Sequence, residues 1–125
     1  MKKFIILGIL LLTVLVGCSD EASLTTDEEV TDLVNNYLEA LKSKDVASMV
    51  IYADDLRFPN KAEQKEQYST IDSDITDTKI VELKKVNETS FEVTIEVVDE
   101  GNLTKLTFPV EKQKKDWKII VGQDL

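Results

Sequence analysis

The spacing of apolar side chains changes twice along the chain, and each spacing is typical of a different structure. Residues 4–16 form one apolar run without a charge. From residue 30 onward, apolar side chains recur every three or four positions, which is the period of one face of an α-helix. From residue 91 onward they alternate with polar side chains, as in a strand with one buried face. The pattern therefore predicts an N-terminal segment, then helices, then strands.

A first helix is predicted to begin at Thr26. This threonine opens the sequence TDEE, which has the form of a capping box between its hydroxyl and the glutamate three residues later. Asp45 and Asn60 are predicted to cap two further helices, with the sequences VASMVIY and KAEQKEQY. The last of these is polar on nearly every side, so we expect it to be exposed. The buried face of the first helix is predicted to consist of Val30, Leu33, Val34, Tyr37, Leu38 and Leu41.

Four strands are predicted in the second half of the chain, at residues 78–86, 91–97, 105–110 and 117–121. The connections between them are short and polar, as in hairpins. Pro109 cannot donate a backbone hydrogen bond, so its strand is expected to lie at a sheet edge or to carry a bulge. Helices followed by strands predict an α+β domain, in which the N-terminal helices pack on one face of a four-strand antiparallel meander.

The amino terminus has the parts of an export signal. Two lysines precede the apolar run, and a small residue precedes Cys18. The run has thirteen residues, whereas a helix that spans a bilayer needs about 20. An uncleaved, buried N-terminal helix is the alternative, but nothing later in the sequence is suited to cover a helix that is apolar on every side.

Residues 15–18 read LVGC, which resembles the lipobox of bacterial lipoproteins. The resemblance implies cleavage before Cys18, diacylglycerol on its sulfur, and a lipid anchor at the extracytoplasmic face of a cell membrane. The chain then divides into a signal peptide (1–17), a lipidated cysteine with a flexible tether (18–24) and one folded domain (25–125). A redox or metal-binding thiol is the alternative, but the chain has neither a second cysteine nor a histidine. Its preference for lysine over arginine favours a Gram-positive source.

Two stretches resemble the small NTF2-like or cystatin-like α+β domains. VTDLVNNYLEALKSKDVASMVIYADD resembles their opening helical pair, and KDWKII resembles their closing strand. The resemblance implies a curved sheet packed on the helices, although such domains usually have a longer sheet than this chain predicts. The candidate lining residues of a pocket between helix and sheet are Tyr37, Tyr52 and Trp117, with Phe91 and Phe108. Their alternative role is ordinary core packing.

The acidic composition restricts the partners of the protein. The net charge is −9, and removing residues 1–17 leaves 108 residues with 13 basic and 24 acidic side chains, a net charge of −11. Nucleic acid is not an expected partner, because its phosphates require clusters of lysine and arginine. Anionic lipid headgroups are repelled, so the acyl chains would hold the protein at the membrane. No nucleotide-binding or hydrolase motif occurs, so no cofactor is expected.

Two acidic clusters are the remaining candidates for chemistry. The Asp54-Asp55 pair lies close to Tyr52 in sequence and could act as an acid or base in a pocket, with a solvated helix end as the alternative. Asp72, Asp74 and Asp77 loosely resemble a calcium loop, but the required glycine and the closing glutamate are missing. No metal site is therefore predicted.

These observations favour a membrane-anchored, non-enzymatic binding module with no catalytic residues. Its partner would be a small ligand, a peptide or another envelope protein. One alternative is a small lyase- or isomerase-like enzyme that uses Asp54 or Asp55 together with a tyrosine. The other is a scaffold or inhibitor that acts through a free sheet edge or through its acidic face.

Overall fold

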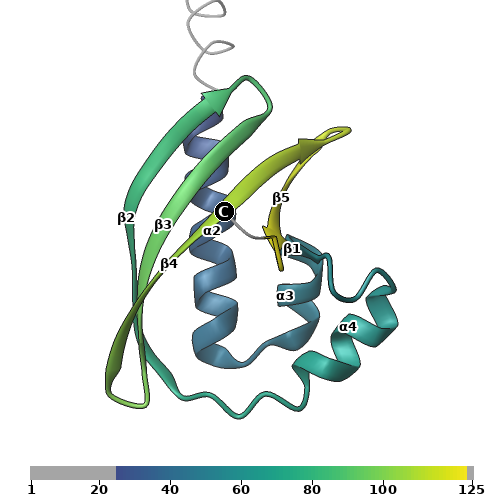
Figure 1. The fold of residues 1–125 in the computed structure, drawn as a ribbon, viewed down its shortest axis with the longest axis vertical. Coiled ribbons are helices and arrows are strands. Elements are labelled where there is room, and N and C mark those ends of the chain that lie inside the picture. The colour runs from purple at the N-terminus through teal and green to yellow at the C-terminus, as the bar shows by residue number, and fades with distance from the viewer. Residues whose placement is uncertain (1–24, 124–125) are drawn as a thin grey trace, which may run out of the picture.

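The computed structural model describes residues 25–123, in which helices pack on the inner side of a strongly bent five-strand sheet (Figure 1). The predicted signal peptide (1–17) and the predicted lipidated cysteine with its tether (18–24) lie outside these residues. No helix in the described part of the chain is long and apolar enough to cross a membrane. In chain order the elements are α2 (Thr26–Ser43), α3 (Val46–Tyr52), β1 (Ala53–Asp55), α4 (Lys61–Tyr68), β2 (Ile75–Asn87), β3 (Ser90–Asp99), β4 (Asn102–Gln113) and β5 (Asp116–Val121).

The helix starts are set by local capping. The capping box of α2 is formed by Thr25 and Glu28, one residue earlier than predicted. The sequence contains two overlapping copies of the motif, and both give the same buried helix face, so periodicity alone does not choose between them. Asp45 and Asn60 cap α3 and α4 as predicted, each by accepting a hydrogen bond from a backbone N–H of the first turn.

The prediction that the third helix is exposed is wrong for one of its faces. Gln64 and Tyr68 of α4 are buried. They are four residues apart, so they lie above one another on the same side of the helix. The helix has eight residues, about two turns, so these two side chains make up its whole buried face. The amide Nε2–H of Gln64 donates to the carbonyl of Ala53 at 3.1 Å, which ties α4 to the edge of the sheet.

The sheet has five strands and not the predicted four. The additional strand, β1, has three residues and pairs in parallel with β5, with Ala53 opposite Ile119. The strand order is β1-β5-β4-β3-β2, and all the other neighbours are antiparallel. Three residues directly after a helix carry no alternation, so β1 could not be recognised before its partner strand was known.

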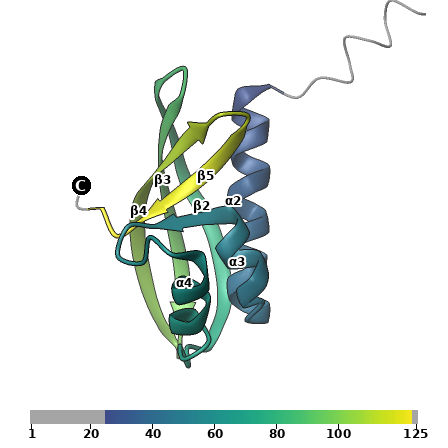
Figure 2. The same cartoon turned by 90° about the vertical axis from the view of Figure 1, so that its right-hand side faces the viewer.

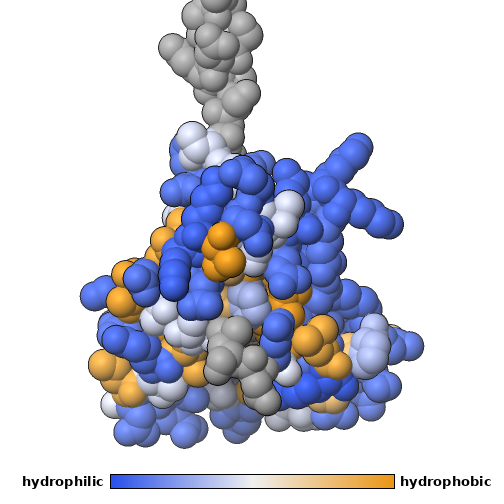
Figure 3. All heavy atoms as spheres, turned by 45° about the horizontal axis from the view of Figure 1, so that its top comes forward, coloured by the Kyte–Doolittle hydropathy of each residue, from blue (hydrophilic) through white to orange (hydrophobic). Residues whose placement is uncertain are grey.

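The long strands bend because their ladder is irregular. The register between β2 and β3 shifts at three points along β2, and each shift adds a kink and twist to the strand. The result is a sheet that curves around α2, as two perpendicular views show (Figures 1 and 2). One face of the molecule is covered mainly by hydrophilic side chains, with hydrophobic ones in small separate groups (Figure 3).

Pro109 marks the point where β4 and β5 separate. Strand β4 lies inside the sheet order and shows no register shift at Pro109, so the predicted bulge is absent from its ladder with β3. The ladder between β4 and β5 begins only at Val110. Residues 102–109 therefore pair with β3 alone, as an edge strand would, while the end of β5 turns away to pair with β1.

The core lies between α2 and the inner face of the sheet. The alternation predicted for β3 is confirmed, because its four inward side chains are each at most 5% exposed. Valines of α2 and residues of β4 and β5 complete the packing. The largest fully buried apolar side chains are Phe91, Ile95, Ile119, Val30, Val34, Val93 and Val110.

Candidate functional site

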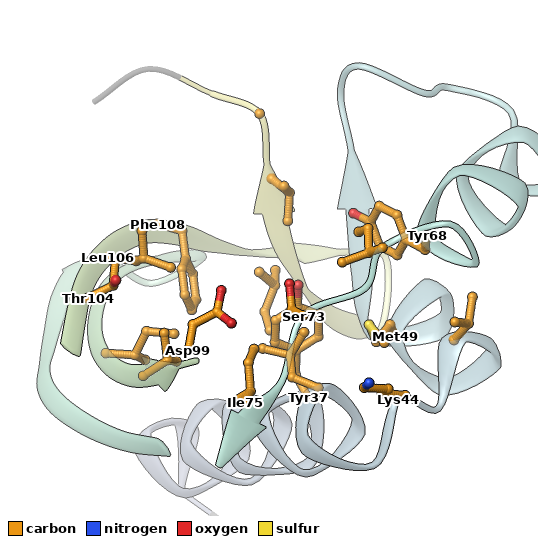
Figure 4. Close-up of a pocket in the computed structure, with 18 of the residues that line it drawn as sticks. Tyr37, Lys44, Met49, Tyr68, Ser73, Ile75, Asp99, Thr104, Leu106 and Phe108 are labelled. Atoms are coloured by element: carbon orange, nitrogen blue, oxygen red, sulfur yellow. The ribbon is translucent and has the colours of Figure 1, made fainter. Parts of the chain in front are cut away.

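A cavity of about 530 Å³ lies between the helices and the inner face of the sheet (Figure 4). Its volume falls within the range of roughly 300–1,000 Å³ that is usual for small-molecule sites. Side chains from three helices and four strands line it, and most of them are apolar. The apolar wall includes Leu41, Met49, Ile95, Val97, Leu106 and Phe108.

The separation of β4 and β5 explains why the domain is hollow at this end. Cavity-lining residues come from 104–108 of β4 and from 119–121 of β5, on the two sides of the gap between these strands. At the opposite end of the same strands the ladder is closed, and Phe91 packs edge-on against Trp117 with ring centroids 5.6 Å apart. The domain is thus packed at one end and hollow at the other.

A few polar side chains interrupt the apolar wall. Asp99, the last residue of β3, directs its carboxylate into the cavity, and Ser73 lies nearby (Figure 4). Asp99 Oδ1 accepts one hydrogen bond, from the backbone N–H of Asp74 at 3.3 Å. Lys44, the left-handed C-cap of α2, also lines the cavity, and its Nζ lies 3.9 Å from Asp72. In the part of the chain that the structure describes, the cavity wall therefore includes one carboxylate, that of Asp99, and one ammonium group, that of Lys44.

An ion pair between a buried aspartate and an exposed arginine lies next to this site. The side chain of Asp55 is fully buried, and its Oδ2 accepts from Nη2 of Arg57 at 2.7 Å and from the hydroxyl of Tyr68 at 2.6 Å. Its Oδ1 accepts from the backbone N–H and Nε of Arg57, at 3.0 and 2.9 Å. Gly122 has a φ of 88° and packs over this pair, where a Cβ would lie 3.2 Å from Oδ1. A side chain at position 122 would therefore be both strained and crowded.

The hydrogen bonds of this cluster fix its protonation state. The bonds from Arg57 outweigh burial and lower the pKa of Asp55 to about 2. Burial, reinforced by the negative charge of Asp55, raises the pKa of Tyr37 to about 12. Burial and the hydrogen bond to Asp55 raise the pKa of Tyr68 well above its usual value. At neutral pH the cluster is therefore a carboxylate, a guanidinium and two protonated phenols.

The two candidate acid–base residues are held in separate ion pairs. Asp54 Oδ1 lies 2.6 Å from Nζ of Lys61, on the outer side of β1, whereas Asp55 points inward to Arg57. Successive strand residues point to opposite faces, so the two carboxylates cannot act together. A carboxylate with a pKa of about 2 is also a weak base at neutral pH.

The structure brings only part of the predicted pocket together. Tyr37 lines the cavity, but Tyr52 and Trp117 line a second, shallower hollow of about 410 Å³ beside α2. The three residues do not share one pocket. Tyr52 lies at the end of α3, and Trp117 lies at the packed end of β5, where its ring contacts Phe91.

Sequence reasoning missed Asp99 and Tyr68. Asp99 comes directly before the polar turn sequence EG, and an aspartate at such a place is typical of a turn. Tyr68 closes a helix that is polar on nearly every side, and the signal that could have found it was its spacing of four residues from Gln64.

Residues 25–123 contain no group of three or more His, Cys, Asp or Glu side chains placed to hold a metal ion.

Comparison with known proteins identifies the fold. No family model and no curated protein sequence matches the chain. A solved structure of a candidate NTF2-like transpeptidase from Campylobacter jejuni is 19% identical, with a TM-score of 0.55, over 74% of this chain and 97% of that one. The chain has an NTF2-like fold. The identity is too low to show more than the fold.

Two further solved structures agree. A ketosteroid isomerase-like protein from Erwinia carotovora atroseptica is 15% identical, with a TM-score of 0.55, over 74% of this chain and 89% of that one. An NTF2-like protein of unknown function from Pseudomonas putida is 12% identical, with a TM-score of 0.52, over 79% of this chain and 86% of that one. The likeness to cystatin-like domains stays a prediction.

Proposed function

We propose that this protein is an extracytoplasmic lipoprotein, anchored by diacylglycerol on Cys18, whose NTF2-like domain binds a small ligand without transforming it. The observation that carries the binding role is the cavity of about 530 Å³ between helices and sheet. It is large enough for a small organic molecule, and its wall combines apolar side chains with a few polar groups, as ligand sites do.

The state of the cluster beside the cavity favours binding over catalysis. An acid or base works best when its pKa lies near the working pH. Asp55 has its pKa lowered to about 2, and that of Tyr37 is raised to about 12, so neither group exchanges a proton readily at neutral pH. Asp55 instead accepts a hydrogen bond from the hydroxyl of Tyr68, a side chain that lines the cavity.

An isomerase- or lyase-like enzyme is the second candidate. One structural neighbour is described as ketosteroid isomerase-like, and the hydroxyl of Tyr68 lies 2.6 Å from a buried carboxylate next to a cavity. A phenol in such a position can donate a hydrogen bond to a substrate oxygen. This role would require Tyr68 to leave Asp55, which accepts its only hydroxyl hydrogen in the described residues.

Filling the cavity is expected to abolish binding. We would titrate N-phenyl-1-naphthylamine, a neutral fluorescent probe, into the mature chain (residues 18–125) with Cys18→Ser in place of the lipidated cysteine. Ser73 is half-buried on the cavity wall, so Ser73→Trp should raise the Kd at least tenfold. Thr70→Trp adds the same ring at an exposed position three residues away that does not line the cavity.

The control variant should bind the probe within about twofold of the parent chain. Thermal unfolding of both variants would show that they remain folded. Equal loss of binding in both variants, or no loss in either, would contradict binding in this cavity. An absence of binding in the parent chain would contradict the proposed binding role itself.

Removing the acylated sulfur is expected to abolish both lipid attachment and cleavage of the signal peptide. Two acyl chains anchor a protein stably, because each buried methylene contributes about 0.8 kcal/mol. In the host, the wild-type chain should incorporate labelled palmitate and sediment with membranes. Cys18→Ala should incorporate none and accumulate as an uncleaved precursor. A Cys18→Ala chain that is cleaved normally and still sediments with membranes would show that the lipid anchor is wrong.

A further inference from the structure

We propose that the ligand is an amphiphilic cation, with an apolar body in the cavity and a positively charged nitrogen paired with the carboxylate of Asp99. This inference rests on the proposed binding function and adds the chemical class of the ligand. It starts from a charge on the cavity wall that no side chain of residues 25–123 neutralises.

Asp99 is placed to meet a ligand. It ends β3, where it pairs with Ile75 on one side and Asn102 on the other, so its backbone is held by two strands. Its side chain is half-buried and points into the cavity (Figure 4). Between residues 25 and 123 no lysine or arginine forms an ion pair with it. One backbone N–H, at 3.3 Å, is its hydrogen-bond donor there.

The surroundings of Asp99 make a cationic partner favourable. Ile75, Val97 and Leu106 also line the cavity and offer no hydrogen bonds from their side chains, and Ile75 pairs with Asp99 in the ladder between β2 and β3. Because Asp99 has no ion-pair partner in residues 25–123, a ligand cation that enters the cavity can pair with its carboxylate through charge-assisted hydrogen bonds. The same apolar groups would contact the apolar body of the ligand. One bound position would therefore satisfy both the apolar body and the charged nitrogen.

Among residues 25–123, Lys44 is the one lysine or arginine on the cavity wall, and its charge attracts an anion less strongly than the charge of Asp99 attracts a cation. Its side chain is 54% exposed, and its Nζ already lies 3.9 Å from Asp72. Solvent and this partner therefore screen its charge. The chain also carries a net charge of −9, which attracts cations towards the cavity and repels anions.

The rim of the cavity has room for a ligand that is only partly buried. Ile71 and Leu106 line the cavity and are 56% and 47% exposed. They give the rim apolar surface that water contacts in the free protein. Covering this surface with an aliphatic chain would contribute to affinity. An amphiphile longer than the cavity is thus compatible with the site.

Three eight-carbon probes separate charge from apolar contact. Octylammonium, 1-octanol and octanoate would each displace N-phenyl-1-naphthylamine from the mature chain with Cys18→Ser, at neutral pH and low salt. We expect octylammonium to bind about tenfold more tightly than 1-octanol, and octanoate to bind most weakly. This order follows because the aliphatic chains are alike and only the head groups differ in charge.

Asp99→Asn should remove the preference for the cation. The amide keeps the size of the side chain and loses its charge, so the affinity for octylammonium should fall about tenfold while that for 1-octanol changes less than twofold. Asp77→Asn is the matched control, because it removes the same charge from an exposed position of β2 that does not line the cavity. That control should leave all three affinities within twofold.

The outcomes distinguish this inference from the proposed function. Equal binding of octylammonium and 1-octanol, or tighter binding of octanoate, would overturn the cationic ligand while the cavity remains a binding site. If the affinity for octylammonium fell equally in Asp99→Asn and Asp77→Asn, the effect would come from net charge alone. That result would also overturn the cationic ligand. If neither the naphthylamine nor any eight-carbon probe bound the parent chain, the proposed binding function would fail first.

Discussion

Asp55→Ala is expected to lower the free energy of unfolding by about 2–3 kcal/mol. The carboxylate accepts four hydrogen bonds, three from Arg57 and one from Tyr68, and it is fully buried. Its removal leaves the hydroxyl of Tyr68 buried without an acceptor. The guanidinium of Arg57 is 59% exposed and can return to water. The loss is therefore smaller than the 3–5 kcal/mol that is usual when a fully buried pair is broken.

The adjacent aspartate provides the control. Asp54 pairs with Lys61 at 2.6 Å, but both side chains are partly exposed, so the pair is screened by solvent. Asp54→Ala should cost less than about 1 kcal/mol. Urea unfolding of both variants, in the mature chain with Cys18→Ser, measures the difference. Similar losses at both positions would contradict the role given to the buried pair.

The same substitution should remove part of the acid sensitivity of the protein. Folding lowers the pKa of Asp55 from its usual 3.8 to about 2, so the unfolded chain binds this proton more readily than the folded chain. The stabilisation is complete above pH 3.8 and is lost as the pH falls through about 2. It corresponds to roughly 2 kcal/mol. Between these pH values, wild-type stability should fall more steeply than that of Asp55→Ala.

The helices were predictable because their signals are local. Asp45 and Asn60 each lie directly before their helix and accept hydrogen bonds from its first turn, which requires nothing from the rest of the fold. Strand β1 is the opposite case. Ala53–Asp55 become a strand only because β5 lies beside them, and no pattern within three residues can show that.

The cavity was harder to predict than the fold because it depends on where two strands separate. Tyr37 was found from its place on the apolar face of α2. Trp117 was expected beside it, but whether β5 packs or opens at a given residue depends on its ladders with β4 and β1. Asp99 is polar and stands before a turn, so its sequence context gave no reason to place it on a cavity wall. Its place on the cavity wall depends on how the end of β3 lies in the folded sheet.

Phe91→Ala is expected to lower the free energy of unfolding by about 3–5 kcal/mol, the largest loss predicted for a single side chain here. Phe91 is 1% exposed, and its ring packs edge-on against Trp117 at 5.6 Å. Alanine would leave a void at the packed end of the domain and would remove an aromatic contact that contributes about 0.5–1.5 kcal/mol. Phe58→Ala is the control, because Phe58 lies in a loop and is only half-buried. Urea unfolding should show a loss of less than about 1 kcal/mol for this control.

Substitutions at the packed end of the sheet should affect stability, whereas substitutions at the hollow end should affect binding. Phe91 does not line the cavity, so folded Phe91→Ala should bind N-phenyl-1-naphthylamine within about threefold of the parent chain. Ser73→Trp should show the reverse, with binding lost and stability nearly unchanged. This separation follows from the ladder between β4 and β5. The two strands pair from Val110 to Gln113, beside Trp117, and residues 102–109 of β4 have no partner in β5. If folded Phe91→Ala also lost binding, the two ends would form one coupled unit, and the cavity could not be treated as a preformed site.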